Sequence, residues 1–187
     1  MRKKLRRLQK ERVRFLMVDI QEKLFPHISD GDEIAANSLR LLASARLMDI
    51  PFFYTEQYPK GLGETESDLI KALPENARRF EKTCFSCMEE PGFTKFLGIR
   101  GKEPVTVVWG IETHICIMST VMDMLDEGMS VAVVSDAVGS RKREHRQTAL
   151  TAMQRAGALV LPTESVVYQL LERAGTEKFK AMLPFFK

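Results

Sequence analysis

Short apolar runs alternate with helix-like stretches along almost the whole chain. The apolar runs cover residues 13–18, 51–55, 103–109, 130–135 and 158–161, and residues 79–82 resemble a further short strand or its exit. Helical spacing covers residues 33–48, 66–73, 114–127, 142–156 and 163–171. Strands that alternate with helices in this way favour βαβ units, whose strands are parallel and whose crossovers are right-handed. We therefore predict an α/β fold, a doubly wound three-layer α/β/α sandwich with a central, mostly parallel sheet.

The basic character of the chain is concentrated at its N-terminus. Residues 1–14 hold eight Lys or Arg and one Glu, whereas the formal net charge of all 187 residues is only +3, so the remainder is mildly acidic. The length fits one domain. We divide the chain into a basic arm, residues 1–12, and a single domain, residues 13–187. One interpretation of the arm is a solvated helical tail or the product of a misassigned start codon. The other is an anchor for nucleic acid or a membrane surface. It lacks aromatic residues, so we expect neither nucleic acid nor membrane as a partner.

Three cysteines bear on the redox setting and the compartment. An odd number with no secretory leader argues against a disulfide framework, and a reduced, cytoplasmic setting fits best, or the mitochondrial matrix in a eukaryote. No apolar run reaches the roughly 20 residues of a membrane span. Cys84 and Cys87 form a C-x-x-C pair, for which a redox dithiol and an incidental placement are the alternatives; zinc would need two more ligands.

Reactive side chains follow successive strand-like runs. Asp19 follows the first, Glu56 and Gln57 the second, Lys82 closes the third, Cys116 ends the segment GIETHIC after the fourth, and Asp136 follows the fifth. In open parallel sheets the site lies at the carboxyl ends of the strands. The sequence therefore predicts a carboxylate, an ammonium and a thiol at one edge of the sheet.

Cys116 stands near the start of the helix expected over 114–127. A helix N-terminus favours thiolate and lowers a cysteine pKa, and its unpaired N–H groups can hold an oxyanion. Asp19 could take the thiol proton and return it to a leaving amine, with Lys82 holding both charges. The structural alternatives are a small packing cysteine, a loop or capping aspartate and a surface lysine.

These residues carry a resemblance to the isochorismatase-like cysteine hydrolases. The matching segments are FLMVDIQEKLFPHI, YTEQYPKGLG, FEKTCFS, VVWGIETHICIMSTVMDMLDEG and VAVVSDAVGSR, and the resemblance spans roughly residues 13–171. It implies a catalytic triad of Asp19, Lys82 and Cys116 and an oxyanion hole from the N–H groups of Glu112 and Cys116. It also implies a non-proline cis peptide between Ile111 and Glu112, and assembly into homo-oligomers, dimers or larger.

The resemblance has limits that narrow the chemistry. Nicotinamidases of this fold carry an Asp/His metal cluster after the second strand, where this chain has Glu56-Gln57-Tyr58-Pro59 and no histidine, so we expect no metal and no cofactor. The intact triad points to C–N bond hydrolysis of a small amide, carbamate or ureide through a Cys116 thioester. The alternative is a non-catalytic binding or scaffold protein on the same fold. By position, the candidate pocket residues are Gln21, Phe25, Gln57, Tyr58, Trp109 and His114.

Overall fold

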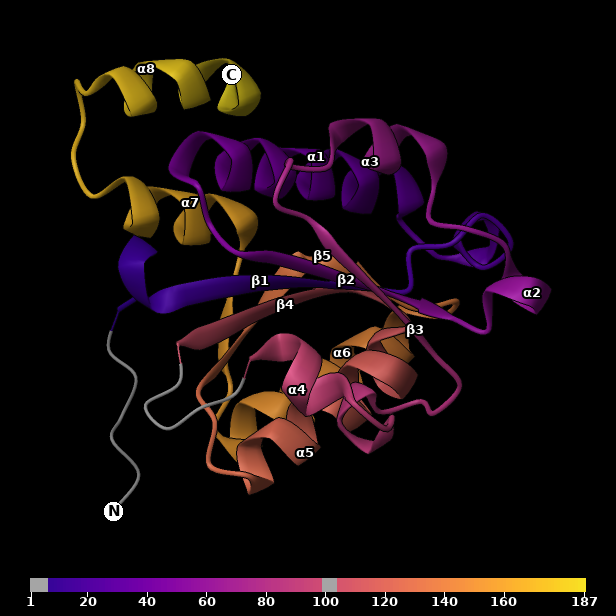
Figure 1. Ribbon diagram of the computed structural model, residues 1–187. Helices are drawn as coiled ribbons and strands as arrows, with labels where there is room; N and C mark the ends of the chain where they lie inside the picture. The colour runs from indigo at the N-terminus through magenta and orange to yellow at the C-terminus, as the bar shows by residue number, and fades with distance from the viewer. Residues whose placement is uncertain (1–6, 99–103) are drawn as a thin grey trace.

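A six-stranded, all-parallel sheet forms the centre of the molecule in the computed structural model, which describes residues 7–98 and 104–187 (Figure 1). The strand order is β3-β2-β1-β4-β5-β6. The strands are β1 (Val13–Val18), β2 (Phe52–Gln57), β3 (Arg78–Lys82), β4 (Val105–Ile111), β5 (Val131–Gly139) and β6 (Leu159–Leu161). The doubly wound α/β prediction is confirmed, because β2 and β3 lie on one side of β1, and β4, β5 and β6 lie on the other.

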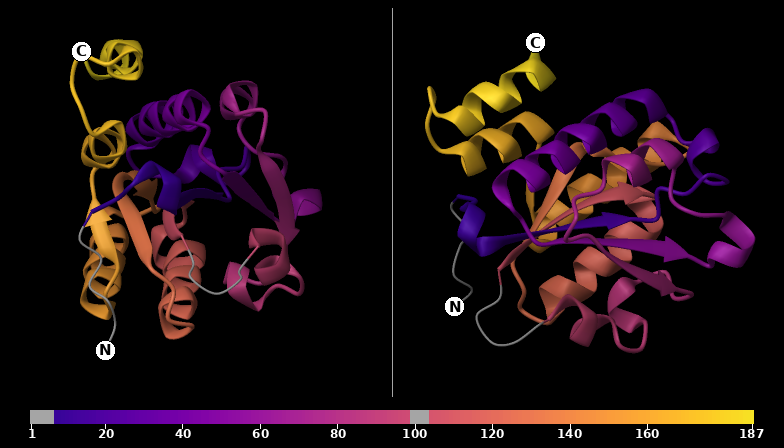
Figure 2. Two further views of the ribbon diagram at one scale, coloured as in Figure 1. Left: turned by 60° about the vertical axis from the view of Figure 1, so that its left-hand side comes forward. Right: turned by 45° about the horizontal axis from the view of Figure 1, so that its top comes forward.

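Helices cover both faces of this sheet, so that three layers result (Figures 1 and 2). One face carries α1 (Gly31–Met48), α3 (Ser67–Ala72) and α7 (Thr163–Leu171); the other carries α4 (Phe93–Leu97), α5 (Met118–Asp126) and α6 (Arg143–Ala156). Helix α8 (Glu177–Met182) lies outside the first of these layers and contacts α1. The short helix α2 (Pro59–Leu62) lies beyond the end of β2. Crossovers through α1, α5 and α6 explain why the sequence alternates between the two periodicities.

The central strands are buried along their whole length, which explains their unbroken apolar runs. Trp109 on β4 lies in this core, where its ring meets Phe15 and Phe52 edge-on at centroid separations of 5.4 and 5.7 Å. Its side chain is fully buried. The structure thus gives Trp109 a packing role, in place of the substrate-pocket position that we expected from its strand end.

Three strands run further than the sequence predicted, and one of them, β4, ends at Ile111 and not at Trp109. β2 continues to Gln57, so Glu56 and Gln57 belong to the strand itself, and β5 continues to Gly139 with a register shift opposite Trp109. Asp136 therefore lies within β5 and is absent from the predicted cluster: its carboxylate accepts hydrogen bonds of 2.7 Å from both the amide and the hydroxyl of Thr163, at the start of α7. This is a helix-capping contact, and it corrects the expectation for Asp136.

The helical turns were the least predictable parts. The stretch 58–63, expected as a loop, contains α2, and neither α4 nor α8 was expected. The helix expected over 114–127 is divided into a π-helical turn, Thr113–Ile117, and the regular helix α5. Cys116 belongs to the π turn and not to an ordinary helix start.

Part of the predicted basic arm is integrated into the fold. The fully buried Leu8 donates its N–H to Gln169 Oε1 on α7 at 2.9 Å, and a 3-10 turn, Lys10–Arg12, leads into β1. Residues 1–6 of the arm lie outside the described residues. Across the described ranges, no helix combines the length and apolarity that crossing a bilayer requires.

Candidate active site

Asp19 follows the last residue of β1 and is held in place by the neighbouring strand. Its backbone lies in the left-handed region (φ 54°), and its side chain is fully buried. Its N–H donates to the carbonyl of Thr55 at 3.1 Å, and the Thr55 hydroxyl donates to Asp19 Oδ1 at 2.7 Å. One carboxylate oxygen is therefore fixed by β2, which leaves Oδ2 directed at a second partner.

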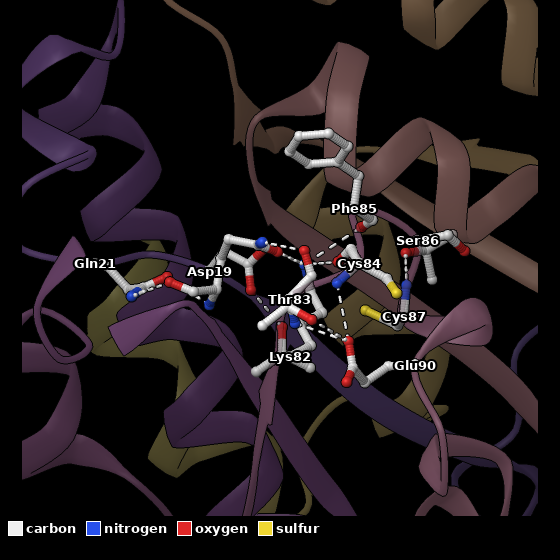
Figure 3. Close-up of polar contacts among 12 residues, drawn as sticks. Asp19, Gln21, Lys82, Thr83, Cys84, Phe85, Ser86, Cys87 and Glu90 are labelled. Atoms are coloured by element: carbon white, nitrogen blue, oxygen red, sulfur yellow. Dashed lines mark hydrogen bonds and ion pairs between the residues drawn. The ribbon is translucent and has the colours of Figure 1, made fainter. Parts of the chain in front are cut away.

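That partner is Lys82, the last residue of β3. Its Nζ lies 2.7 Å from Asp19 Oδ2, and both side chains have no exposed surface (Figure 3). Nζ also donates to Gln57 Oε1 at 2.6 Å and to the carbonyls of Cys84 and Phe85 at 3.2 and 3.3 Å. Burial is the largest single influence and lowers the pKa of Lys82, but the Asp19 carboxylate and the neighbouring Cys87 and Cys116 together raise it above its ordinary value. Lys82 is therefore an ammonium in a buried ion pair.

Cys116 approaches Asp19 and Lys82 from the other side of β1. It lies in the π-helical turn that follows β4, and β4 is the neighbour of β1 opposite to β2. Only 7% of its surface is exposed, and its thiol lies within the electrostatic influence of both Asp19 and Lys82. Burial and then the Asp19 carboxylate raise the pKa of this thiol well above its ordinary value, against the opposing effect of Lys82. A lowered pKa was expected from the nearby helix N-terminus, and that expectation is wrong, because burial dominates.

The segment before Cys116 contains an unusual backbone and a charged cluster. The peptide bond between Ile111 and Glu112 is cis. The Glu112 carboxylate is paired with Arg141 Nε at 3.2 Å and lies 3.9 Å from His114 Nδ1. His114 also lies 3.0 Å from the Ser140 hydroxyl, and its ring is 4.6 Å from that of His145. Burial lowers the pKa of His114, which favours the neutral imidazole at this rim.

Gln21 and Gln57, both expected in a substrate pocket, instead bind protein atoms. Gln21 Oε1 accepts the Gln57 N–H at 2.8 Å, and its Nε2 donates to the carbonyls of Gln57 and Gly63 at 3.0 and 2.7 Å. Gln57 accepts from Lys82 and donates to the carbonyl of Thr83 at 2.7 Å. Both amides are engaged at both ends, so their geometry supports the ion pair and the surrounding loops.

The remaining pocket candidates are more peripheral. Phe25 is half-buried and lines a surface hollow with Pro26, Ile28 and the first turn of α1, which does not include Asp19, Lys82 or Cys116 in its lining. Tyr58 is 55% exposed, and its N–H donates to the Lys82 carbonyl at 2.8 Å. Of the six candidates, Tyr58 and His114 thus combine exposed surface with closeness to the reactive residues.

The C-x-x-C pair also adjoins this site, which sequence reasoning missed for Cys87. Cys87 is fully buried, its N–H donates to Thr120 Oγ1 one turn after Cys116, and burial raises its pKa to about 12. Cys84 is half-buried, and its N–H donates to Glu90. All three cysteines are free thiols. Over residues 7–98 and 104–187, no three His, Cys, Asp or Glu side chains come together as a metal-binding group, and independence of metal stays a prediction.

Known proteins resemble this chain in both sequence and structure. The model of the isochorismatase domain matches residues 14–165. A mouse protein, isochorismatase domain-containing protein 2A, is 37% identical over 186 residues, which cover 100% of this chain and 88% of the relative. A structure described as MAR1 ribonuclease from Caenorhabditis elegans has 37% identity and a TM-score of 0.88, with 96% and 92% of the two chains covered. YcaC from Pseudomonas aeruginosa, solved with hexane-2,5-diol and covalent acrylamide, has 26% identity, a TM-score of 0.87 and coverage of 96% and 91%. The chain belongs to the isochorismatase family of hydrolases.

Proposed function

We propose that this protein is a metal-independent cysteine hydrolase that cleaves a C–N bond of a small amide, carbamate or ureide. The observation that carries the proposal is the fully buried Asp19–Lys82 ion pair beside the Cys116 thiol. An ion pair removed from water is costly unless it is fully hydrogen-bonded, and a packing role for Cys116 does not call for one. Perturbed ionisable groups gathered at one strand edge are typical of catalysis.

The proposed reaction begins with a protonated thiol. Asp19 takes the Sγ proton as sulfur bonds to the substrate carbonyl carbon, and the carbonyl π electrons move to oxygen. The N–H groups of Glu112 and Cys116 are the proposed oxyanion hole. Asp19 then gives its proton to the leaving nitrogen as the C–N bond breaks, and a thioester remains. Water, deprotonated by Asp19, attacks the thioester and releases the acid and the thiol.

Lys82 has a separate task in this scheme. Its ammonium pairs with the Asp19 carboxylate and stabilises the negative charge that develops on sulfur. The raised pKa of Cys116 fits this division of labour, because a thiol that rests protonated depends on a base at the moment of attack.

Intact-mass spectrometry on small amides, carbamates and ureides tests the proposal. We expect a covalent adduct on the wild type that is lost in Cys116→Ala and retained in Cys84→Ala, which removes the more accessible thiol. Acrylamide is the first probe, since the related YcaC was solved with acrylamide in covalent form. Equal adduct formation by wild type and Cys116→Ala, with no turnover of any compound, would favour the alternative of a binding or scaffold protein.

Ribonuclease activity is a second candidate, because the C. elegans relative is described as a ribonuclease. In this chain the adjacent His114 and His145 rings and the nearby Arg141 could serve acid–base and phosphate contacts. Short single-stranded RNA is therefore included in the same assay. Cleavage that persists in Cys116→Ala and disappears in His114→Ala would move the assignment from the amide to RNA.

Assembly and compartment also remain proposals. Homo-oligomerisation, expected from the resemblance, is measured by light scattering coupled to size-exclusion chromatography. A mass of 21.3 kDa, that of one chain, would contradict it. The cytoplasmic location needs a direct localisation experiment.

A further inference from the structure

Strand β2 separates the two strands that carry the ion pair. Asp19 follows β1 and Lys82 ends β3, while β2 lies between them and is hydrogen-bonded to both. Alternate side chains of a strand point to the same face, so Thr55 and Gln57 share one face and Glu56 points to the other. Accordingly, Thr55 binds Asp19, Gln57 binds Lys82, and Glu56 is engaged by Thr65 and Arg79.

The amide of Gln57 has a fixed orientation. Its Nε2 donates to the carbonyl of Thr83 at 2.7 Å, and a carbonyl cannot accept from an amide oxygen. The oxygen must therefore face the other way, where it accepts from Lys82 Nζ at 2.6 Å. The backbone of Gln57 is held in turn by Gln21, through bonds at 2.8 and 3.0 Å. The acceptor that Lys82 meets is thus rigid.

Within the described part of the chain, the hydrogen-bond and ion-pair contacts of Lys82 Nζ are all with oxygen acceptors: the carboxylate of Asp19, the amide oxygen of Gln57, and the carbonyls of Cys84 and Phe85. An ammonium has three N–H donors and no acceptor, whereas a neutral amine would turn a lone pair toward one of these oxygens. Hydrogen bonds to a charged group are also the stronger ones. The surroundings of Nζ therefore select the charged form at a fixed position.

We infer that Gln57 is a positioning residue for the reaction at Cys116: its amide oxygen holds the Lys82 ammonium against Asp19, and it acts on the thiol only through that ammonium. The inference rests on the proposed role of Cys116. Without Gln57 Oε1, Lys82 loses the shortest of its four contacts, and its charge is less firmly held beside the thiol. Thiolate formation then becomes less favourable, and Cys116 reacts more slowly at a given pH.

The test measures the rate of acrylamide addition to Cys116 from pH 6.5 to 10 by intact mass, in the Cys84→Ala background, together with the melting temperature. We expect Gln57→Met to shift the pH profile upward and to slow addition at pH 8 about ten-fold, which is the effect of roughly one pKa unit. The shorter Gln57→Asn, whose amide cannot reach Nζ, should shift it in the same direction if Gln57→Met fails to fold.

Asn37 supplies the matched control. Its buried amide donates to the carbonyl of Asp136 at 2.7 Å and accepts from Arg40 at 2.7 Å, so it binds one carbonyl and one cation as Gln57 does, but on α1. Asn37→Leu should lower the melting temperature without moving the pH profile. A shift as large as that of Gln57→Met would mean that loss of any buried amide perturbs the thiol, and would overturn the inference.

A double-mutant cycle tests the route through Lys82. If Gln57 acts only through the ammonium, Gln57→Met should cause no further slowing in a Lys82→Met background. A further ten-fold slowing there would overturn the inference. These outcomes do not depend on hydrolysis. If no amide yields a thioester but the acrylamide-addition rates of the variants differ as expected, the hydrolase proposal fails and the positioning role of Gln57 stands.

Discussion

Cys116 illustrates how burial can reverse an expectation drawn from sequence. Its place after a strand and before a helix suggested a thiol activated by the helix terminus. The structure instead places it in a π-helical turn with 7% exposure, beside a carboxylate, and its pKa is raised. The sequence could identify the residue, because the motif is local, but its ionisation depends on how many atoms cover it, which only the fold determines.

The first prediction concerns this ionisation. Since the pKa of Cys116 lies above the experimental range, the thiolate fraction should rise about ten-fold per pH unit between pH 7 and 9. Addition of acrylamide to Cys116, followed by intact mass, should rise in parallel. A rate that is already constant from pH 7 upward would show that the thiol is ionised at neutral pH and contradict the prediction.

The second prediction separates the reactivity of the thiol from catalysis. Asp19 raises the pKa of Cys116 and Lys82 lowers it, so Asp19→Asn should speed alkylation of Cys116 at pH 8. The same change removes the proposed base, and turnover of an amide substrate should fall about 10²–10⁴-fold. The rates of Cys116 alkylation and of amide hydrolysis, measured on the same preparation, check both expectations. A parallel loss of both rates would instead indicate collapse of the site.

At the scale of secondary-structure elements, the strands were predicted well and their neighbours were not. Apolar runs located five of the six strands to within a few residues, because buried parallel strands favour unbroken apolar sequence; β3, with the sequence RRFEK, is mostly charged and exposed. The order of the strands within the sheet does not follow from any local sequence pattern. The ion pair that Lys82 forms with Asp19 across β2 could therefore not be predicted from the sequence. For the same reason Cys87 looked incidental, although the fold buries it between Lys82 and α5.

The third prediction concerns the hydrogen bond from β2 to Asp19. Thr55→Val keeps the shape of the side chain and removes the hydroxyl that donates to Asp19 Oδ1 at 2.7 Å. A buried acceptor left without its donor should lower the free energy of unfolding by about 1–3 kcal/mol. Urea unfolding measures this, with Thr151→Val, an exposed hydroxyl bonded within α6, as the control expected to cost less.

The fourth prediction concerns the close approach of β4 to β1. Gly110 has φ +127°, and a Cβ there would collide with the backbone oxygen of Val18. Gly110→Ala should therefore destabilise the protein by about 3 kcal/mol or more. Gly128 also has a positive φ, +76°, but nothing lies within 4 Å of its Cβ position, so Gly128→Ala should cost only about 1–2 kcal/mol. Equal losses would refute a steric origin.

At the scale of the whole molecule, the start of the described chain is anchored to α7, far along the sequence. Leu8 is fully buried and its N–H is bonded to Gln169 on α7, although 161 residues separate them. The charge-based boundary at residue 12 could not reveal this, because a single apolar residue among basic ones does not form a periodic pattern. What the sequence described as an arm is, from residue 8, part of the packed domain.

The fifth prediction follows from that contact. Leu8→Ala should lower the free energy of unfolding by about 2–5 kcal/mol, the usual range for a buried leucine. Urea unfolding followed through the fluorescence of Trp109, which is the only tryptophan and is fully buried, reports on the whole core. Lys10→Ala, which removes an exposed ion pair with Glu11, should change the midpoint little. Equal effects of the two variants would contradict a packing role for Leu8.

The outermost strands of the sheet also restrict how copies of this protein can meet. On one side, β3 bears the exposed charged side chains of Arg78, Arg79 and Glu81, and on the other, β6 has only three residues. Charged and very short borders prevent strands of separate molecules from pairing. A continuous intermolecular sheet is thereby disfavoured at both borders, which protects the protein from aggregation through its strands and leaves helices and loops as the surfaces for any regular assembly.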